Sequence, residues 1–79
     1  MKIILTSHAR EQMAEQEDDV TEEQIKTVLC NWHTTVPGNQ ATTIRYVGFI
    51  GVAKELSVVT QAPGIAVEPV KIVTVYWES

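Results

Sequence analysis

Two helices followed by several strands are predicted by the spacing of apolar residues along this chain. The clearest pattern is a set of four apolar residues spaced i, i+3, i+4 and i+7: Ile25, Val28, Leu29 and Trp32. This spacing places the four side chains on one face of a helix. Thr21 is a suitable N-cap and Gln24 takes the third helical position, so the two residues form a capping box. A helix is therefore predicted from Thr21 to about Trp32.

A shorter helix is predicted before this one, from His8 to about Gln16. Ser7 is a favourable N-cap residue, and Ala9, Met13 and Gln16 share one side of the predicted helix. The segment in front of it, residues 2–6, is rich in β-branched residues and predicts a short strand. Residues 17–19, which are all acidic, are expected to form the turn between the two helices.

Three longer strands are predicted after the helices, at residues 42–50, 54–60 and 70–77, with a further short strand at residues 33–36. Pro37-Gly38-Asn39 marks a turn, and Gln61 to Pro69 is a longer hairpin loop. Gly48 is expected to lie at a β-bulge. Short turns join these strands, which favours an antiparallel sheet. The predicted fold class is α+β, with one domain over residues 1–79 and two helices covering a sheet of three to four strands.

Composition is ordinary for a soluble protein. The chain has 79 residues, of which 44% are hydrophobic, and no apolar run approaches the roughly 18 residues that cross a membrane. Met1 to Leu5 is too short for the core of a signal peptide, so the expected location is cytoplasmic. The one cysteine, Cys30, excludes an internal disulfide. Cys30 and His33 have the spacing of half a zinc site but lack a second half, so neither a metal nor a cofactor is predicted.

Charge is unevenly distributed along the chain. Seven of the ten carboxylates lie between Glu11 and Glu23, opposed in the first 23 residues only by Lys2 and Arg10. The remainder of the chain carries a charge of about +1, within a net charge of −4. A strongly basic surface for nucleic acid is therefore excluded. Any contact with RNA or DNA is expected to be local, on the sheet.

Residues with acid–base and phosphate-binding chemistry stand at both ends of the chain. His8 and Arg10 open the first helix, and Thr74 and Tyr76 share one face of the last strand. Arg45 lies mid-strand and points away from its apolar neighbours. Imidazole, guanidinium and hydroxyl groups are what a metal-free phosphodiester reaction needs. Each residue also has a structural interpretation: helix packing for His8, surface charge for the two arginines, and strand propensity for Thr74 and Tyr76.

These features in this order resemble a known family. The segments that carry the resemblance are Ser7-His8-Ala9-Arg10, Met13, Thr21-Glu22-Glu23-Gln24-Ile25 with Val28-Leu29, and Val73-Thr74-Val75-Tyr76-Trp77. Together they resemble the family known as domain of unknown function 4258, which is similar to BrnT-type toxins and more distantly to RelE-like and barnase-like ribonucleases. The resemblance implies helices followed by a curved antiparallel sheet. The reaction it implies is metal-independent RNA cleavage, in which the ribose 2′-hydroxyl attacks the adjacent phosphate.

The resemblance assigns the family's early histidine to His8 and its terminal hydroxyl groups to Thr74 and Tyr76. The family's first-helix arginines fall near Gln12 and Gln16, and Arg10 is a candidate replacement for one of them. Glutamine supplies no charge, and charge-assisted hydrogen bonds are roughly twice as strong as neutral ones. Activity is therefore expected to be weakened or latent.

Two classes of function follow. The first is a toxin-like ribonuclease, with His8 as acid or base, Arg10 and Arg45 as phosphate ligands, and Thr74 and Tyr76 as hydrogen-bonding or proton-transfer groups. Its expected partners are an RNA substrate and an antitoxin-like protein. The second is a non-catalytic interaction or dimerisation module on the same fold, with an apolar patch around Tyr46, Phe49 or Trp77. Trp77 is interpreted there as a core or homodimer residue.

Overall fold

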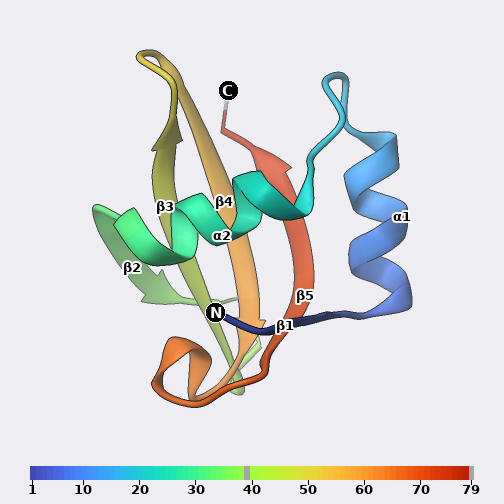
Figure 1. Cartoon of the computed structure of the whole chain (residues 1–79). Helices are drawn as coiled ribbons and strands as arrows, with labels where there is room; N and C mark the ends of the chain where they lie inside the picture. Colours follow the sequence, from blue (N-terminus) through green and yellow to red (C-terminus); the bar gives the residue numbers. More distant parts are fainter. Residues whose placement is uncertain (39, 79) are drawn as a thin grey trace.

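The fold is α+β, as predicted, with two helices on a mixed β-sheet (Figure 1). The structure is a computed structural model and describes residues 1–38 and 40–78. The helices are α1 (Ser7–Glu15) and α2 (Glu22–Asn31). The strands are β1 (Ile3–Leu5), β2 (Thr34–Pro37), β3 (Thr43–Ile50), β4 (Lys54–Gln61) and β5 (Val70–Trp77). Neither helix in the described ranges is long and apolar enough to span a membrane.

The sheet differs from the predicted one in two respects. Within the described residues it has five strands, in the order β1-β5-β4-β3-β2, rather than three to four. It is also mixed rather than antiparallel, because β1 pairs in parallel with β5 while every other pair is antiparallel. The difference arises because β1 and β5 lie at opposite ends of the chain. Short turns constrain only strands that follow one another, and they say nothing about this pairing.

Helix α2 contributes more buried core residues than α1 does. Its capping box is present as predicted, and Ile25, Val28 and Leu29 are buried against the sheet. Trp32, the fourth residue of the predicted stripe, is the C-cap and remains 39% exposed. The stripe therefore describes the buried face of α2 well, except at the end where the helix stops.

Gly48 does not lie at a bulge, contrary to the prediction. The irregularity in the sheet falls instead between Val59 and Thr60, where β4 pairs with β5. Gly48 lies directly beneath α2, and a Cβ atom there would come within 3.3 Å of Val28 Cγ1 and 3.4 Å of Trp32 Cα. The missing side chain is what lets α2 approach β3 closely.

The loop between β4 and β5 is fastened to the core by Tyr46. The Tyr46 hydroxyl accepts a hydrogen bond from the backbone N–H of Ile65 at 3.2 Å. Gly64 has a φ of +68°, and a Cβ atom there would lie 2.2 Å from the same hydroxyl oxygen. Tyr46 is thereby only 5% exposed. It is a core residue and does not contribute to a surface patch.

Trp77 is held inside the same chain by the acidic turn after α1. Its Nε1 donates to the Asp18 carbonyl at 2.7 Å, and Lys54 Nζ lies 5.1 Å from the ring centroid. Lys54 also forms an ion pair with the Asp18 carboxylate. The indole packs against the core cluster. These contacts agree with the interpretation of Trp77 as a core residue.

Helix α1 covers the outer edge of β5 rather than the face of the sheet. Strand β1 pairs only with Val70–Ile72, which leaves the next part of the β5 edge without a strand partner. Thr6, which is the N-cap of α1 in place of the predicted Ser7, donates from Oγ1 to the Ile72 carbonyl at 2.9 Å. Gln16 then donates to the Val75 carbonyl at 3.4 Å and accepts from the Trp77 N–H at 3.3 Å. The Gln16 amide thus bonds to β5 as a strand backbone would.

This edge contact predicts a specific sensitivity at Gln16. Gln16→Glu keeps the acceptor for the Trp77 N–H but removes the donor and places a carboxylate against the Val75 carbonyl. We expect it to lower the free energy of unfolding by about 1–2 kcal/mol. Glu11→Gln, at an exposed position of the same helix, serves as the control and should change it by less than about 0.5 kcal/mol. Urea denaturation followed by circular dichroism measures both, and a Gln16→Glu protein as stable as the wild type would contradict the assigned role.

Candidate functional site

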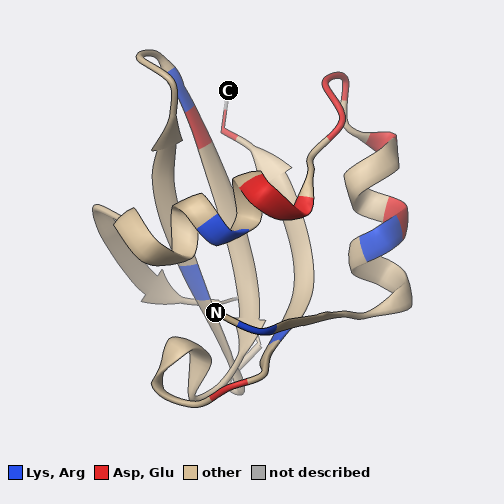
Figure 2. Cartoon of the chain, viewed as in Figure 1, with Lys and Arg blue, Asp and Glu red and all other residues tan. Residues whose placement is uncertain are grey.

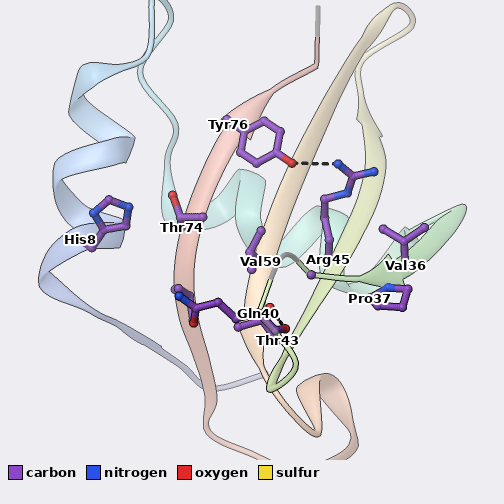
Figure 3. Close-up of a pocket in the computed structure, with 11 residues that line it drawn as sticks. His8, Val36, Pro37, Gln40, Thr43, Arg45, Val59, Thr74 and Tyr76 are labelled. Atoms are coloured by element: carbon purple, nitrogen blue, oxygen red, sulfur yellow. Dashed lines mark hydrogen bonds between the residues drawn. The ribbon is translucent and has the colours of Figure 1, made fainter.

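A cavity of about 430 Å³ lies on the face of the sheet opposite α2 (Figure 3). Four of the five predicted site residues line it, namely His8, Arg45, Thr74 and Tyr76. They come from α1, β3 and β5, which are far apart in the sequence. The fold therefore gathers into one cavity most of the groups that the sequence singled out.

The register of the sheet determines how these residues are arranged. Arg45 pairs with Val59, and Val59 pairs with Thr74, so the three residues form one row across β3, β4 and β5. Adjacent strands are about 4.8 Å apart, which separates the backbones of Arg45 and Thr74 by roughly 10 Å. Val59 lines the cavity between them. It forms an apolar floor with polar groups on either side.

Tyr76 reaches diagonally over β4 to the Arg45 side chain. Arg45 Nη1 donates a hydrogen bond to the Tyr76 hydroxyl at 2.9 Å (Figure 3). A guanidinium has only donors, so the Tyr76 oxygen must be the acceptor in this bond. The phenolic proton of Tyr76 is therefore directed away from Arg45. It remains available to a ligand in the cavity.

Arg45 is a cation without a carboxylate partner in the described part of the chain. The hydrogen bond to Tyr76 raises its pKa, burial opposes this, and attraction to Tyr76 and Glu78 adds to the rise. The group stays charged throughout the range in which proteins fold. Its Nε is buried and has no hydrogen-bond partner among the described residues. Such a guanidinium is suited to bind an anion.

His8 overhangs the cavity from the side of α1. The residue is exposed, and Figure 3 shows its ring on the side of α1 that faces Thr74. His8, Gln12 and Gln16 are spaced by four residues, so they follow one face of the helix. Gln16 fixes that face against the β5 edge. The same contact therefore places His8 beside the cavity.

Arg10 is not brought to this cavity. It lies two residues after His8, which is about 200° around a helix of 3.6 residues per turn. Arg10 lines a separate depression together with Asp19 and Glu22. Those neighbours are acidic, and they make this location unfavourable for a phosphate group.

The charge distribution separates the cavity from the acidic part of the chain. Figure 2 shows the acidic residues concentrated on the loop between the helices and on the adjoining helix ends. No carboxylate is among the described residues that line the cavity, whereas Arg45 and His8 are. The protein is acidic as a whole but presents a locally neutral or cationic cavity. This arrangement fits the expectation of a local contact on the sheet.

Several lining residues were not singled out from the sequence. Pro37 is the last residue of β2, Gln40 lies in the connection to β3, Thr43 is the first residue of β3, and Val59 is on β4. The strand pattern can identify Val59, which pairs with both Arg45 and Thr74, and Thr43, which is two residues before Arg45 on β3. Residues of the connection carry no periodic signal that would indicate their orientation.

Cys30 and His33, which share the Cys-x-x-His spacing, are not among the residues that line the cavity. Cys30 is exposed on α2, and His33 Nε2 lies 2.9 Å from the Glu55 carboxylate. Its Nδ1 lies 2.8 Å from the Thr34 hydroxyl. Among the described residues there is no group of three or more His, Cys, Asp or Glu side chains that could hold a metal ion. Both residues are outside the cavity.

Comparisons with known protein families, with curated proteins and with solved structures gave no match. The resemblance drawn from the sequence motifs is therefore a prediction without independent support.

The pairing of Arg45 with Tyr76 predicts an energetic coupling between them. Tyr76→Phe removes the acceptor and Arg45→Met removes the donor, and the double variant leaves neither group unpaired. We expect a coupling energy of about 1 kcal/mol in a double-mutant cycle measured by urea denaturation. Thr74→Val combined with Arg45→Met is the control cycle and should show additive effects. Strict additivity for the Tyr76 cycle would contradict the importance of this bond.

Proposed function

We propose that this protein is a weak, metal-independent RNA-cleaving enzyme whose site is the cavity on the open face of the sheet. The observation that carries the proposal is the gathering of His8, Arg45, Thr74 and Tyr76 around one cavity with no carboxylate among its described lining residues. An RNA phosphodiester offers the complementary features, namely a single negative charge, several acceptor oxygens and a hydroxyl nucleophile beside the phosphorus.

The proposed reaction assigns a role to each group. His8 removes the proton of the ribose 2′-hydroxyl, and the 2′-oxygen forms a bond to phosphorus. Arg45 stabilises the additional negative charge, and Thr74 donates a hydrogen bond to a phosphate oxygen. The bond from phosphorus to the 5′-oxygen then breaks, and the Tyr76 hydroxyl protonates that oxygen. The products are a 2′,3′-cyclic phosphate and a 5′-hydroxyl end.

The proposed activity is weak because the site has few cations to stabilise the transition state. Arg45 is the one guanidinium among the described lining residues, and Arg10 lies elsewhere. Gln16 occupies a position where the resembled family has an arginine, and its amide is used to hold the β5 edge. A transition state with a single cationic ligand is stabilised less than one with two or three.

The proposed function also implies a class of protein and a partner. We infer a RelE- or BrnT-like domain that acts in the cytoplasm on RNA and is controlled by an antitoxin-like protein. The arrangement of two helices before the long antiparallel strands supports this inference. Strand β1, which precedes both helices, departs from the helices-first order that the resemblance implies, although the sequence predicts a strand there.

RNA cleavage by the purified protein in EDTA tests the proposal. We expect slow cleavage that leaves 2′,3′-cyclic ends, reduced about 100-fold or more by His8→Ala and by Arg45→Met. Arg10→Ala is the matched arginine control, and it should retain wild-type activity because Arg10 is remote from the cavity. Absence of cleavage by a folded sample, or equal loss in the Arg10 and Arg45 variants, would overturn the proposed site.

The alternative is a non-catalytic interaction or dimerisation module on the same fold. Its supporting observation is the exposure of apolar residues near the β3–β4 turn, where Phe49 is 51% exposed and Val52 is fully exposed. Tyr46 and Trp77 do not extend this patch, because Tyr46 is buried and Trp77 packs within its own chain. The patch is therefore smaller than the sequence suggested.

Self-association distinguishes the alternative from the ribonuclease. If the protein dimerises through this patch, Phe49→Ser will shift sedimentation towards the monomer, and none of the cavity variants will affect RNA. Phe49 contacts His33, with ring centroids 4.8 Å apart, and lies outside the cavity, so Phe49→Ser should not alter cleavage. Sedimentation velocity at several protein concentrations measures the effect. If the wild-type protein is a monomer, the dimerisation module is ruled out.

A further inference from the structure

The cavity has two ends with different chemistry. One end carries the charged and proton-transferring groups described above. The other end is formed by residues at the end of β2, in the described part of the connection and at the start of β3, and all of them are uncharged: Val36, Pro37, Gly38, Gln40 and Thr43. A phosphate needs only the first end. The second end is therefore suited to bind a neutral group that is attached to that phosphate.

Gln40 is the residue at the uncharged end that can distinguish one ligand from another. Its backbone carbonyl accepts two hydrogen bonds from Thr43, from N at 3.0 Å and from Oγ1 at 2.9 Å. These bonds close a turn and fix the position of the Gln40 backbone, from which the side chain extends. Figure 3 shows the Gln40 side chain extending from this turn towards β5, across the end of the cavity. The side-chain amide makes no hydrogen bond to another described residue, so its donor and its acceptor are both available.

The rest of this end is suited to a flat, weakly polar group. Val36 and Pro37 present apolar surface from β2 on one side of Arg45, and Val59 presents apolar surface from β4 on the other side. The whole cavity of about 430 Å³ lies within the usual range of roughly 300–1,000 Å³ for small-ligand sites. It is too small for a folded RNA element but suited to one nucleotide and its phosphate.

We propose that the uncharged end of the cavity binds the nucleobase next to the phosphate, and that Gln40 determines base preference. A glutamine amide offers one donor and one acceptor side by side, which matches the paired donor and acceptor on a base edge. Unstacked bases in single-stranded RNA expose such edges to proteins. This inference rests on the proposed function, because it takes the anion at Arg45 to be an RNA phosphate.

Binding of small ligands tests the inference separately from cleavage. The probes are the four nucleoside 3′-monophosphates, ribose 5-phosphate and inorganic phosphate, each titrated into ¹⁵N-labelled protein and followed by NMR. We expect at least one nucleotide to bind about 10-fold more tightly than ribose 5-phosphate. Gln40→Ala should remove the differences among the four nucleotides while changing the dissociation constant of inorganic phosphate by less than about twofold.

Thr42→Ala is the matched control, because Thr42 is exposed in the same connection and does not line the cavity. It should bind every probe as the wild type does. Nucleotides that bind no more tightly than ribose 5-phosphate, or a preference that survives Gln40→Ala, would overturn the inference, as would binding of none of the probes. If base-dependent binding through Gln40 is found without RNA cleavage, the nucleotide site stands and the proposed reaction fails.

Discussion

The uncovered edge of β5 is the constraint on which the arrangement of this protein depends. Strand β1 is too short to cover it, and an exposed strand edge would invite pairing with other chains. Thr6 and Gln16 complete the edge with side-chain hydrogen bonds, and between them they anchor both ends of α1. Because α1 has Ala9 as its one fully buried residue, these polar contacts carry much of its attachment. The position of His8 over the cavity follows from them.

The acidic residues that stabilise the fold and the arginine of the candidate site lie on different parts of the molecule. The acidic residues cluster around the turn between the helices, where Asp18 engages Lys54 and the Trp77 indole and so helps to close the core. Arg45 is left on the opposite face without an ion pair among the described residues, and Tyr76 orients it without neutralising it. A carboxylate in place of the Tyr76 hydroxyl would stabilise the guanidinium more strongly but would cancel its charge. The neutral partner preserves the attraction for an anion.

Elements with strong local periodicity were predictable, and elements that depend on long-range contacts were not. The stripe of α2, its capping box and the three long strands follow from neighbouring residues alone. The parallel pairing of β1 joins Ile3 to Val70, and no local pattern encodes it. Alternation grouped Thr74 with Tyr76 and separated Arg45 from Ile44 and Tyr46, whereas the pairing of β3 and β5 with β4 is what puts Arg45 on the same face as Thr74. Arg10 was grouped with His8 by proximity in sequence, although the helical repeat turns the two residues in nearly opposite directions. Gln40 escaped notice because its orientation is set by a turn.

The hydrogen bonds of Gln16 explain why this position holds an amide and not an additional cation. An arginine at position 16 has no acceptor for the Trp77 N–H and would leave that group unpaired. An amide satisfies both the Trp77 N–H and the Val75 carbonyl. Gln16 therefore completes the sheet edge, and it lies beside Glu17, Asp18 and Glu78 rather than in the cavity. In the proposed ribonuclease, a single guanidinium would hold the phosphodiester but supply little of the charge stabilisation that its transition state needs. Under that proposal, RNA binding should accordingly survive better than RNA cleavage.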